Sequence, residues 1–86
     1  MTYNDMRALT RPWRGPFRVH TTDGVSYDVR FSEQFVLTTE HLHIGLLKDP
    51  EGDTLEHGVY IDLEHITRLE PLKLPSKPKG NGQAAE

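Results

Sequence analysis

The segment PFRVHTTDGVSYDVRF at residues 16–31 constrains the fold most, because its alternating pattern predicts a β-hairpin in one specific register. Residues that face each other across antiparallel strands point to the same side of the sheet. A two-residue turn of Asp23 and Gly24 would pair Val19 with Asp28 and would mix apolar and charged side chains on both faces. That register is therefore excluded.

A three-residue loop at 22–24 gives a consistent hairpin instead. It is a type I turn that contains Asp23 and is closed by Gly24 as a bulge in the left-handed region. Arg18 then lies opposite Asp28 on the polar face as a cross-strand ion pair. The apolar face is continuous, with the pairs Thr21–Val25, Val19–Tyr27 and Phe17–Val29.

The remaining strands follow from shorter alternating segments. After a turn at 32–34, residues 35–36 lead into a third strand at 37–47, followed by a polar turn at 48–53 and a fourth strand at 55–63. A tight turn at 64–66 precedes a fifth strand at 67–72, which Pro71 restricts to an edge position. The side chains expected to face inward from the third and fourth strands are Leu42, Ile44, Leu46, Val59, Ile61 and Leu63.

The ends of the chain differ from this β-rich middle. Residues 2–9 predict a short helix that begins at an N-cap Thr2, buries a stripe of Tyr3, Met6 and Leu9, and ends before Pro12. Two turns of helix do not persist alone, so the helix must dock on the sheet or on a neighbouring molecule. Residues 73–86 are rich in proline, glycine and lysine and predict a disordered tail. The chain is thus expected to form one domain at 1–72.

Composition excludes several functional classes. The 86 residues carry a net charge of −3, which argues against a general nucleic-acid binder, and contain no cysteine for disulfides or thiolate sites. No segment has the features of a signal peptide or approaches the ~20 apolar residues of a membrane span. We therefore expect a soluble, cytoplasmic protein.

Charge is also distributed unevenly along the chain. Residues 1–30 carry five arginines against three aspartates, whereas residues 31–70 carry nine acids against two bases. The acidic middle either forms a solvated face or suits a basic partner.

The order of elements resembles the small barrels of the Src-homology-3-like (SH3-like) and Sm-like type. This resemblance implies a mainly β fold, a small five-stranded antiparallel barrel with a short N-terminal helix. The Sm motif expects a glycine at Val29 and a basic-glycine pair near 60–62, so the RNA pocket of that family is not implied. Residues 1–72 also look like a group of short bacterial proteins, a resemblance that implies a fold and no activity. The matching residues are Arg11, Pro12, Pro16, Phe17, Arg18, Val19, His20, Thr22, Asp23, Gly24 and 60–72.

Five histidines raise the question of a metal site. His41 and His43 have the spacing that places two imidazoles on one strand face, and His20 with Glu40 or Asp62 would be needed to complete a zinc site. Exposed histidines explain the pattern better, so no metal or cofactor is predicted. The carboxylates at 49, 51 and 53 lack a calcium-loop pattern, and Asp62 with Glu64 is read as solvated. The sequence contains no nucleophile elbow and no phosphate loop, which argues against an enzyme.

These observations favour a non-enzymatic interaction module that associates with itself or with another protein through open strand edges. Trp13 is expected to pack over one end of the barrel or, alternatively, to form an exposed surface with arginines. The second hypothesis is binding of RNA or another single-stranded nucleic acid, with the lysine-containing tail as an auxiliary contact, through Arg7, Arg11, Trp13, Arg14 and Arg18. The candidate interaction residues are Arg11, Trp13, Arg14, Arg18, Phe35, Val36 and Leu47. The last three fall off the main inward-facing stripe and are expected to form an apolar patch.

Overall fold

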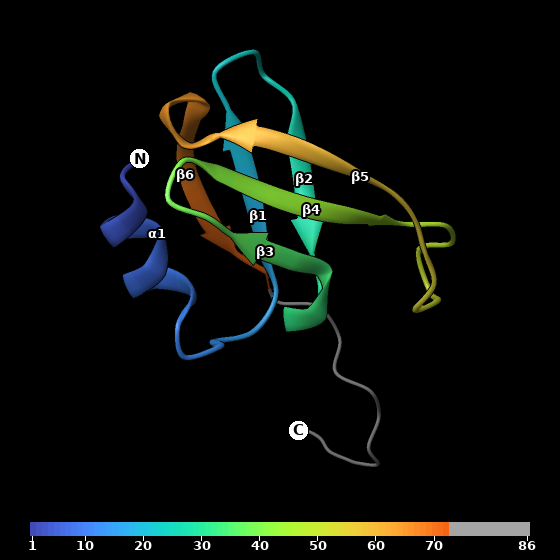
Figure 1. Ribbon diagram of the computed structural model, residues 1–86. Helices are drawn as coiled ribbons and strands as arrows, with labels where there is room; N and C mark the ends of the chain where they lie inside the picture. The colour runs from blue at the N-terminus through green and yellow to red at the C-terminus, as the bar shows by residue number, and fades with distance from the viewer. Residues whose placement is uncertain (73–86) are drawn as a thin grey trace.

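The computed structural model of the protein describes residues 1–72 and is mainly β (Figure 1). One α-helix precedes six strands, which form two antiparallel sheets of three strands each. The predicted tail at 73–86 lies outside the described residues. The elements are α1 (Tyr3–Thr10), β1 (Phe17–Thr21), β2 (Ser26–Val29), the 3₁₀ turn η1 (Ser32–Gln34), β3 (Phe35–Leu37), β4 (His41–Leu47), β5 (Leu55–Asp62), the 3₁₀ turn η2 (Leu63–His65) and β6 (Ile66–Pro71).

The hairpin β1–β2 has the predicted register. The backbone N–H of Thr21 donates to Val25 O over 3.1 Å, and that of Gly24 donates to Thr21 O over 3.0 Å. Gly24 has a φ of 86°, the left-handed conformation that the bulged loop requires. The prediction of a three-residue loop is confirmed, with the pairs Phe17–Val29, Arg18–Asp28, Val19–Tyr27 and His20–Ser26.

The first sheet has the strand order β2-β1-β6, so β1 is its central strand. β6 lies at an edge, as Pro71 requires, and pairs antiparallel with β1 from Phe17–Pro71 to His20–Arg68. The register then shifts at a bulge next to Thr21, where the N–H of Thr22 donates to His65 O over 2.9 Å.

The second sheet has the order β3-β4-β5, and here one prediction is wrong. Residues 37–47 do not form one strand, because the chain reverses at 38–40. The Thr38 N–H donates to His41 O over 2.9 Å, and the Thr38 hydroxyl oxygen accepts from His41 N–H over 3.0 Å. Leu37 therefore pairs directly with Leu42, and both face inward although they are five positions apart in the sequence.

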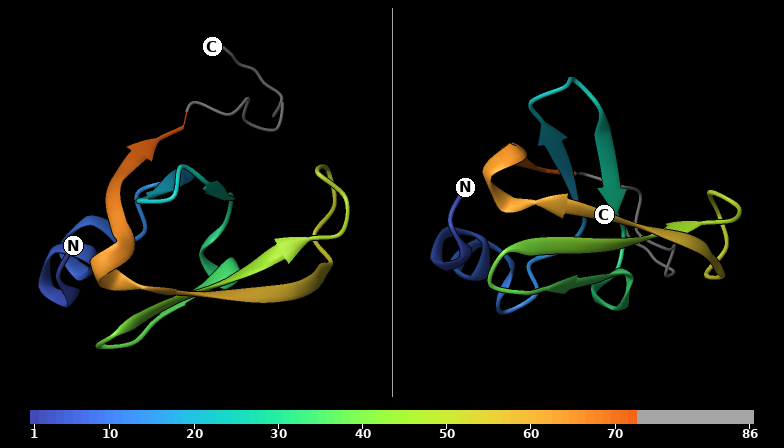
Figure 2. Two further views of the ribbon diagram at one scale, coloured as in Figure 1. Left: turned by 90° about the horizontal axis from the view of Figure 1, so that it is seen from above. Right: turned by 45° about the horizontal axis from the view of Figure 1, so that its top comes forward.

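This extra turn makes six strands rather than the predicted five. Within residues 1–72 the strands are hydrogen-bonded as two separate sheets and do not form a closed barrel. Figure 1 shows that the strands of one sheet run across those of the other. The β4–β5 hairpin extends to one side of the molecule, and α1 lies at the opposite side, as the view from above in Figure 2 also shows.

The hydrophobic core lies between the two sheets, and α1 covers one end of it. The helix begins at Thr2, whose hydroxyl oxygen accepts from the Asp5 N–H over 3.1 Å, so the predicted N-cap is confirmed. Met6 is fully buried, but Leu9 is 48% exposed, so the predicted helical stripe is only partly correct. Thr10 takes the buried position one residue later. The buried hydrophobic residues are Met6, Phe17, Val19, Val29, Leu42, Ile44, Ile61, Leu63 and Ile66.

The connection between the sheets depends on one buried amide side chain. Gln34 at the end of η1 is only 3% exposed. Its Oε1 accepts from the Arg30 N–H over 2.7 Å, and its Nε2 donates to Asp28 O over 2.9 Å. Gln34 thus replaces the backbone partners that β2 lacks where it ends.

The predicted tight turn between the last two strands is η2, and it is held from three sides. The N–H of Leu63 donates to Glu40 O over 3.0 Å, and His65 O accepts from Thr22 N–H. The ammonium group of Met1 donates to Leu63 O over 3.0 Å and lies 3.3 Å from Ile66 O. η2 is therefore fixed relative to both sheets and to the start of α1.

Candidate interaction surface

A row of exposed side chains crosses the outer face of the sheet β3–β4–β5. The register places Val36 beside His43 and His43 beside Tyr60, so that each strand contributes one residue. Val36 is 60% exposed and Tyr60 is 74% exposed. The rings of His43 and Tyr60 are stacked, with centroids 3.8 Å apart and planes 6° from parallel. An aromatic platform therefore faces solvent at the centre of this sheet.

A second pair extends the row toward η2. His41 lies opposite Asp62, and its Nε2 is 2.9 Å from Asp62 Oδ1. The His41 ring centroid is 6.0 Å from that of His43 and 6.4 Å from that of Tyr60. We call Val36, His41, His43, Tyr60 and Asp62 the outer sheet face.

On the other side of this row, β4 and β5 each carry a glycine, so neither strand has a side chain of its own above the sheet backbone at this point. Gly45 pairs with Gly58 across β4 and β5. The Leu55 side chain covers Gly45, because a Cβ atom there would lie only 2.6 Å from Leu55 Cδ1. Above Gly58, only the Ile44 carbonyl oxygen lies near the Cβ position. Leu55 is itself 41% exposed, so an apolar side chain and bare backbone continue the outer sheet face.

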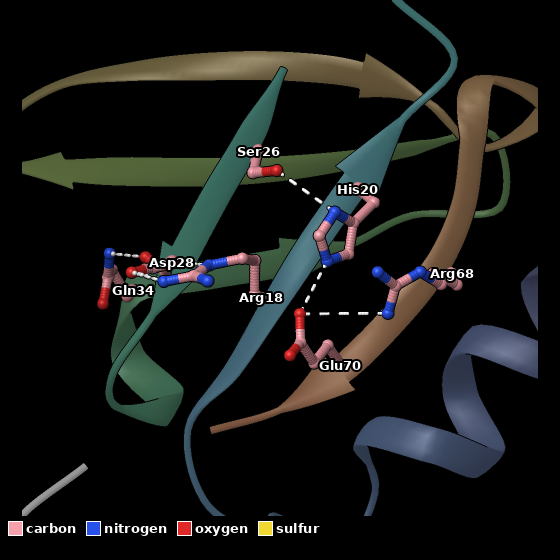
Figure 3. Close-up of polar contacts among 7 residues, drawn as sticks. All are labelled: Arg18, His20, Ser26, Asp28, Gln34, Arg68 and Glu70. Atoms are coloured by element: carbon pink, nitrogen blue, oxygen red, sulfur yellow. Dashed lines mark hydrogen bonds and ion pairs between the residues drawn. The ribbon is translucent and has the colours of Figure 1, made fainter. Parts of the chain in front are cut away.

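The outer face of the sheet β2–β1–β6 is different, because its polar groups bind one another (Figure 3). Arg18 Nε donates to Asp28 Oδ1 over 2.6 Å, and its Nη2 donates to Oδ2 over 3.1 Å. Glu70 Oε1 lies 2.8 Å from His20 Nε2 and 3.8 Å from Arg68 Nη1. Ser26 Oγ completes the network, 3.1 Å from His20 Nδ1.

These contacts shift the pKa values of Arg18 and Glu70. Hydrogen bonding to the Asp28 carboxylate raises the pKa of Arg18, and hydrogen bonding with His20 lowers the pKa of Glu70. Two arginines are balanced by two carboxylates on this face. We therefore read it as a surface whose charges already have partners within the protein.

Trp13 lies at the end of the core rather than on an isolated surface. Its ring centroid is 6.0 Å from that of Phe17 and 6.2 Å from that of Phe35. The Phe17 and Phe35 rings meet edge to face at 5.5 Å. Trp13 remains 37% exposed, so it covers these two rings and keeps one side in solvent.

The structure does not bring the predicted interaction residues together on one surface. Phe35 faces inward and Val36 faces outward, so they cannot form the apolar patch inferred from sequence. Arg18 belongs to the polar network of the other sheet. Leu47 is half-buried at the end of β4, next to a register shift.

The arginines near the helix take separate positions. Arg14 Nη2 donates to Ala8 O over 3.1 Å, which turns the Arg14 side chain back toward the helix end. Arg11 is exposed immediately after α1 and lines a shallow hollow together with Arg7. The nucleic-acid hypothesis requires these arginines and Arg18 on one face and available to phosphates. Arg18 is instead paired with Asp28, which does not favour that arrangement.

Tyr60 was not among the predicted residues, although its alternation with the inward-facing Ile61 could have indicated an outward aromatic ring. The predicted histidine pair is also divided, because His43 stacks on Tyr60 and His41 contacts Asp62. His20 lies in the other sheet, bonded to Glu70. Among residues 1–72, one group of potential ligand atoms lies within 4.8 Å of one another, contributed by Asp62, Glu64 and His65.

No protein-family model, curated protein or solved structure matches this chain. In the described part of the chain, no helix has the length and apolar character needed to cross a membrane.

Proposed function

We propose that the protein is a non-enzymatic interaction module that associates with a second copy of itself or with another protein through the outer sheet face. The observation that carries this proposal is the exposed stack of His43 and Tyr60 beside Val36. Aromatic side chains are enriched in protein interfaces, because they bury a large area at a small cost in conformational entropy. The opposite face of the same sheet packs in the core, so this platform is held rigidly.

The edge of β5 adds a second means of association. β5 pairs with β4 on one side, and the sheet order places no described strand on its other side. An open edge offers unpaired N–H and C=O groups to a strand of another chain. β5 and η2 carry the exposed acidic residues Glu56, Asp62 and Glu64, which favours a partner with basic side chains.

This proposal also includes the resemblance of the fold to the Sm-like and SH3-like barrels and a cytoplasmic location. The tight turn η2 between the last two strands and the crossing of two small antiparallel sheets support the fold assignment. The additional strand β3 is a departure from the five-stranded pattern of those barrels.

The test is sedimentation equilibrium of the purified chain over a wide concentration range, with the variants Tyr60→Ser and Val36→Ser. We expect self-association that each variant weakens at least tenfold, whereas Val25→Ser, which removes an exposed apolar side chain from the β1–β2 loop, leaves it unchanged. Affinity capture from the native organism tests association with a different protein. The proposal fails if the wild type stays monomeric and Tyr60→Ser captures the same proteins as the wild type.

Binding of single-stranded RNA through the N-terminal arginines is the alternative function. One observation favours it: Arg7 and Arg11 line the same hollow beside α1, together with Asn4, Ala8 and Pro12. Such binding would weaken steeply with salt as counterions are released. A titration of labelled single-stranded RNA at 50 and 200 mM salt, with the Arg7→Ala/Arg11→Ala double variant, separates the two functions. Binding that is absent at both concentrations, or that is insensitive to salt, excludes the RNA function.

A further inference from the structure

We propose that His41, Asp62, Glu64 and His65 form a binding site for Zn²⁺ at the junction of β4, β5 and η2. The two histidines come from different elements, and both direct Nε2 toward the Asp62 carboxylate. His41 Nε2 is 2.9 Å from Oδ1, and His65 Nε2 is 3.9 Å from Oδ2. The site shares His41 and Asp62 with the outer sheet face but does not rest on the proposed interaction function, since it requires only residues around one carboxylate.

The distances suit a tetrahedral ion. Zinc binds imidazole nitrogen and carboxylate oxygen at about 2.0–2.2 Å, so neighbouring ligand atoms of a tetrahedral site lie about 3.3 Å apart. The two nitrogen–oxygen distances at Asp62 lie on either side of this value. Ligand atoms of Asp62, Glu64 and His65 lie within 4.8 Å of one another. His41 joins this group through its contact with Asp62, so binding requires rotation of the side chains to bring all four donors to bonding distance.

The donor set selects the metal. Imidazole nitrogens favour zinc and related transition metals, whereas Ca²⁺ takes six to eight oxygen ligands and Mg²⁺ requires octahedral oxygen coordination. Two imidazoles with two carboxylates match the nitrogen and oxygen ligands that zinc accepts when cysteine is absent. The chain contains no cysteine, so no thiolate site competes for the ion.

The backbone around the site is already fixed. Leu63, between Asp62 and Glu64, donates its N–H to Glu40 O, and the His65 carbonyl accepts from Thr22 N–H. The Met1 ammonium group binds the Leu63 carbonyl from the helix side. Metal binding therefore requires ordering of side chains only, which reduces its entropic cost.

The site is also open to solvent. Asp62, Glu64 and His65 are exposed, and an open hollow of about 520 Å³ lies beside Asp62 and Glu64, between the start of α1 and η2. The residues that line the hollow include His41, Asp62 and Glu64. An ion could enter from solvent and keep a water molecule as a further ligand on this side.

The test is isothermal titration calorimetry of the untagged full chain with ZnCl₂. We expect saturable binding of one ion, weakened at least tenfold by His41→Gln and by His65→Gln. His43→Gln and His57→Gln are matched controls on the same hairpin and should bind as the wild type does. Circular dichroism of each variant verifies that it is folded, and CaCl₂ should give no saturable heat.

The assignment is overturned if the wild type shows no saturable binding of Zn²⁺. It is equally overturned if the folded His41→Gln and His65→Gln variants bind as tightly as the two controls. In either case the contacts of Asp62 with the two histidines are ion pairs alone.

Discussion

Replacement of Gln34 by leucine should destabilise the protein strongly, although leucine is apolar and nearly as large. The Gln34 side chain is buried and makes two hydrogen bonds to the backbone, to Arg30 N–H and Asp28 O. Leucine fills the same space but leaves this donor and this acceptor without a partner. The cost therefore comes from polar groups that remain in place, rather than from a cavity.

An unsatisfied buried polar group costs about 1–3 kcal/mol, and both backbone groups here are partly buried, so we expect a loss of about 2–4 kcal/mol. Total stability for a domain of this size is about 4–11 kcal/mol, so the loss is a large fraction of it. For Gln34→Glu, the loss of stability should depend on pH. A carboxylate still accepts from Arg30 N–H, but it donates to Asp28 O only when protonated, so its penalty should decrease as the pH falls.

Urea unfolding followed by circular dichroism measures both variants. At an m value of about 1 kcal/mol/M, the midpoint of Gln34→Leu should fall by about 2–4 M. Glu33→Gln changes the exposed neighbour in the same turn and should stay within about 0.5 kcal/mol of the wild type. If Gln34→Leu is as stable as this control, the two hydrogen bonds do not hold the connection between the sheets.

Two further predictions concern the β1–β2 loop. Gly24→Val should lower the free energy of unfolding by at least about 1 kcal/mol, because a β-branched residue resists the φ of 86° at this position. Gly24→Asn should lower it less. Equal urea midpoints for the two variants would contradict this prediction. The hydrogen bond from the Thr21 hydroxyl lowers the pKa of Asp23 in the folded protein from its ordinary value of 3.8. The stability that this contact contributes is therefore fully present above pH 3.8, and it is lost as the pH falls through the lower pKa of the folded state. Thr21→Val should thus be less stable than the wild type at pH 7, with a difference that narrows toward pH 3, while Thr22→Val should show no such trend.

The sequence was sufficient where side-chain parity and residue type agreed. The β1–β2 register followed from two faces that had to match, and the edge position of β6 followed from the missing N–H of Pro71. The N-cap was readable because Thr2 has its backbone partner, Asp5, only three residues away. All of these features depend on local chemistry.

The features that could not be predicted depend on tertiary context. The turn at Thr38 contains neither glycine nor proline, and a threonine hydroxyl replaces the usual turn residues, so β3 was merged with β4. Because of this error, Phe35 was predicted to lie off the inward-facing stripe, whereas it faces inward. The outer sheet face was missed because the contact of His43 with Tyr60 depends on pairing between two strands whose register the sequence alone did not fix.

The central position of β1 has a consequence for how the chain folds. Its partner β2 follows after a three-residue loop, but His20 and its contact Glu70 in β6 are 50 residues apart. Pairing of β1 with β2 therefore closes a short loop, whereas pairing of β1 with β6 closes a long one and should form later. Until β6 docks, one edge of β1 is open to a β6 strand of another molecule, which is the condition for strand exchange.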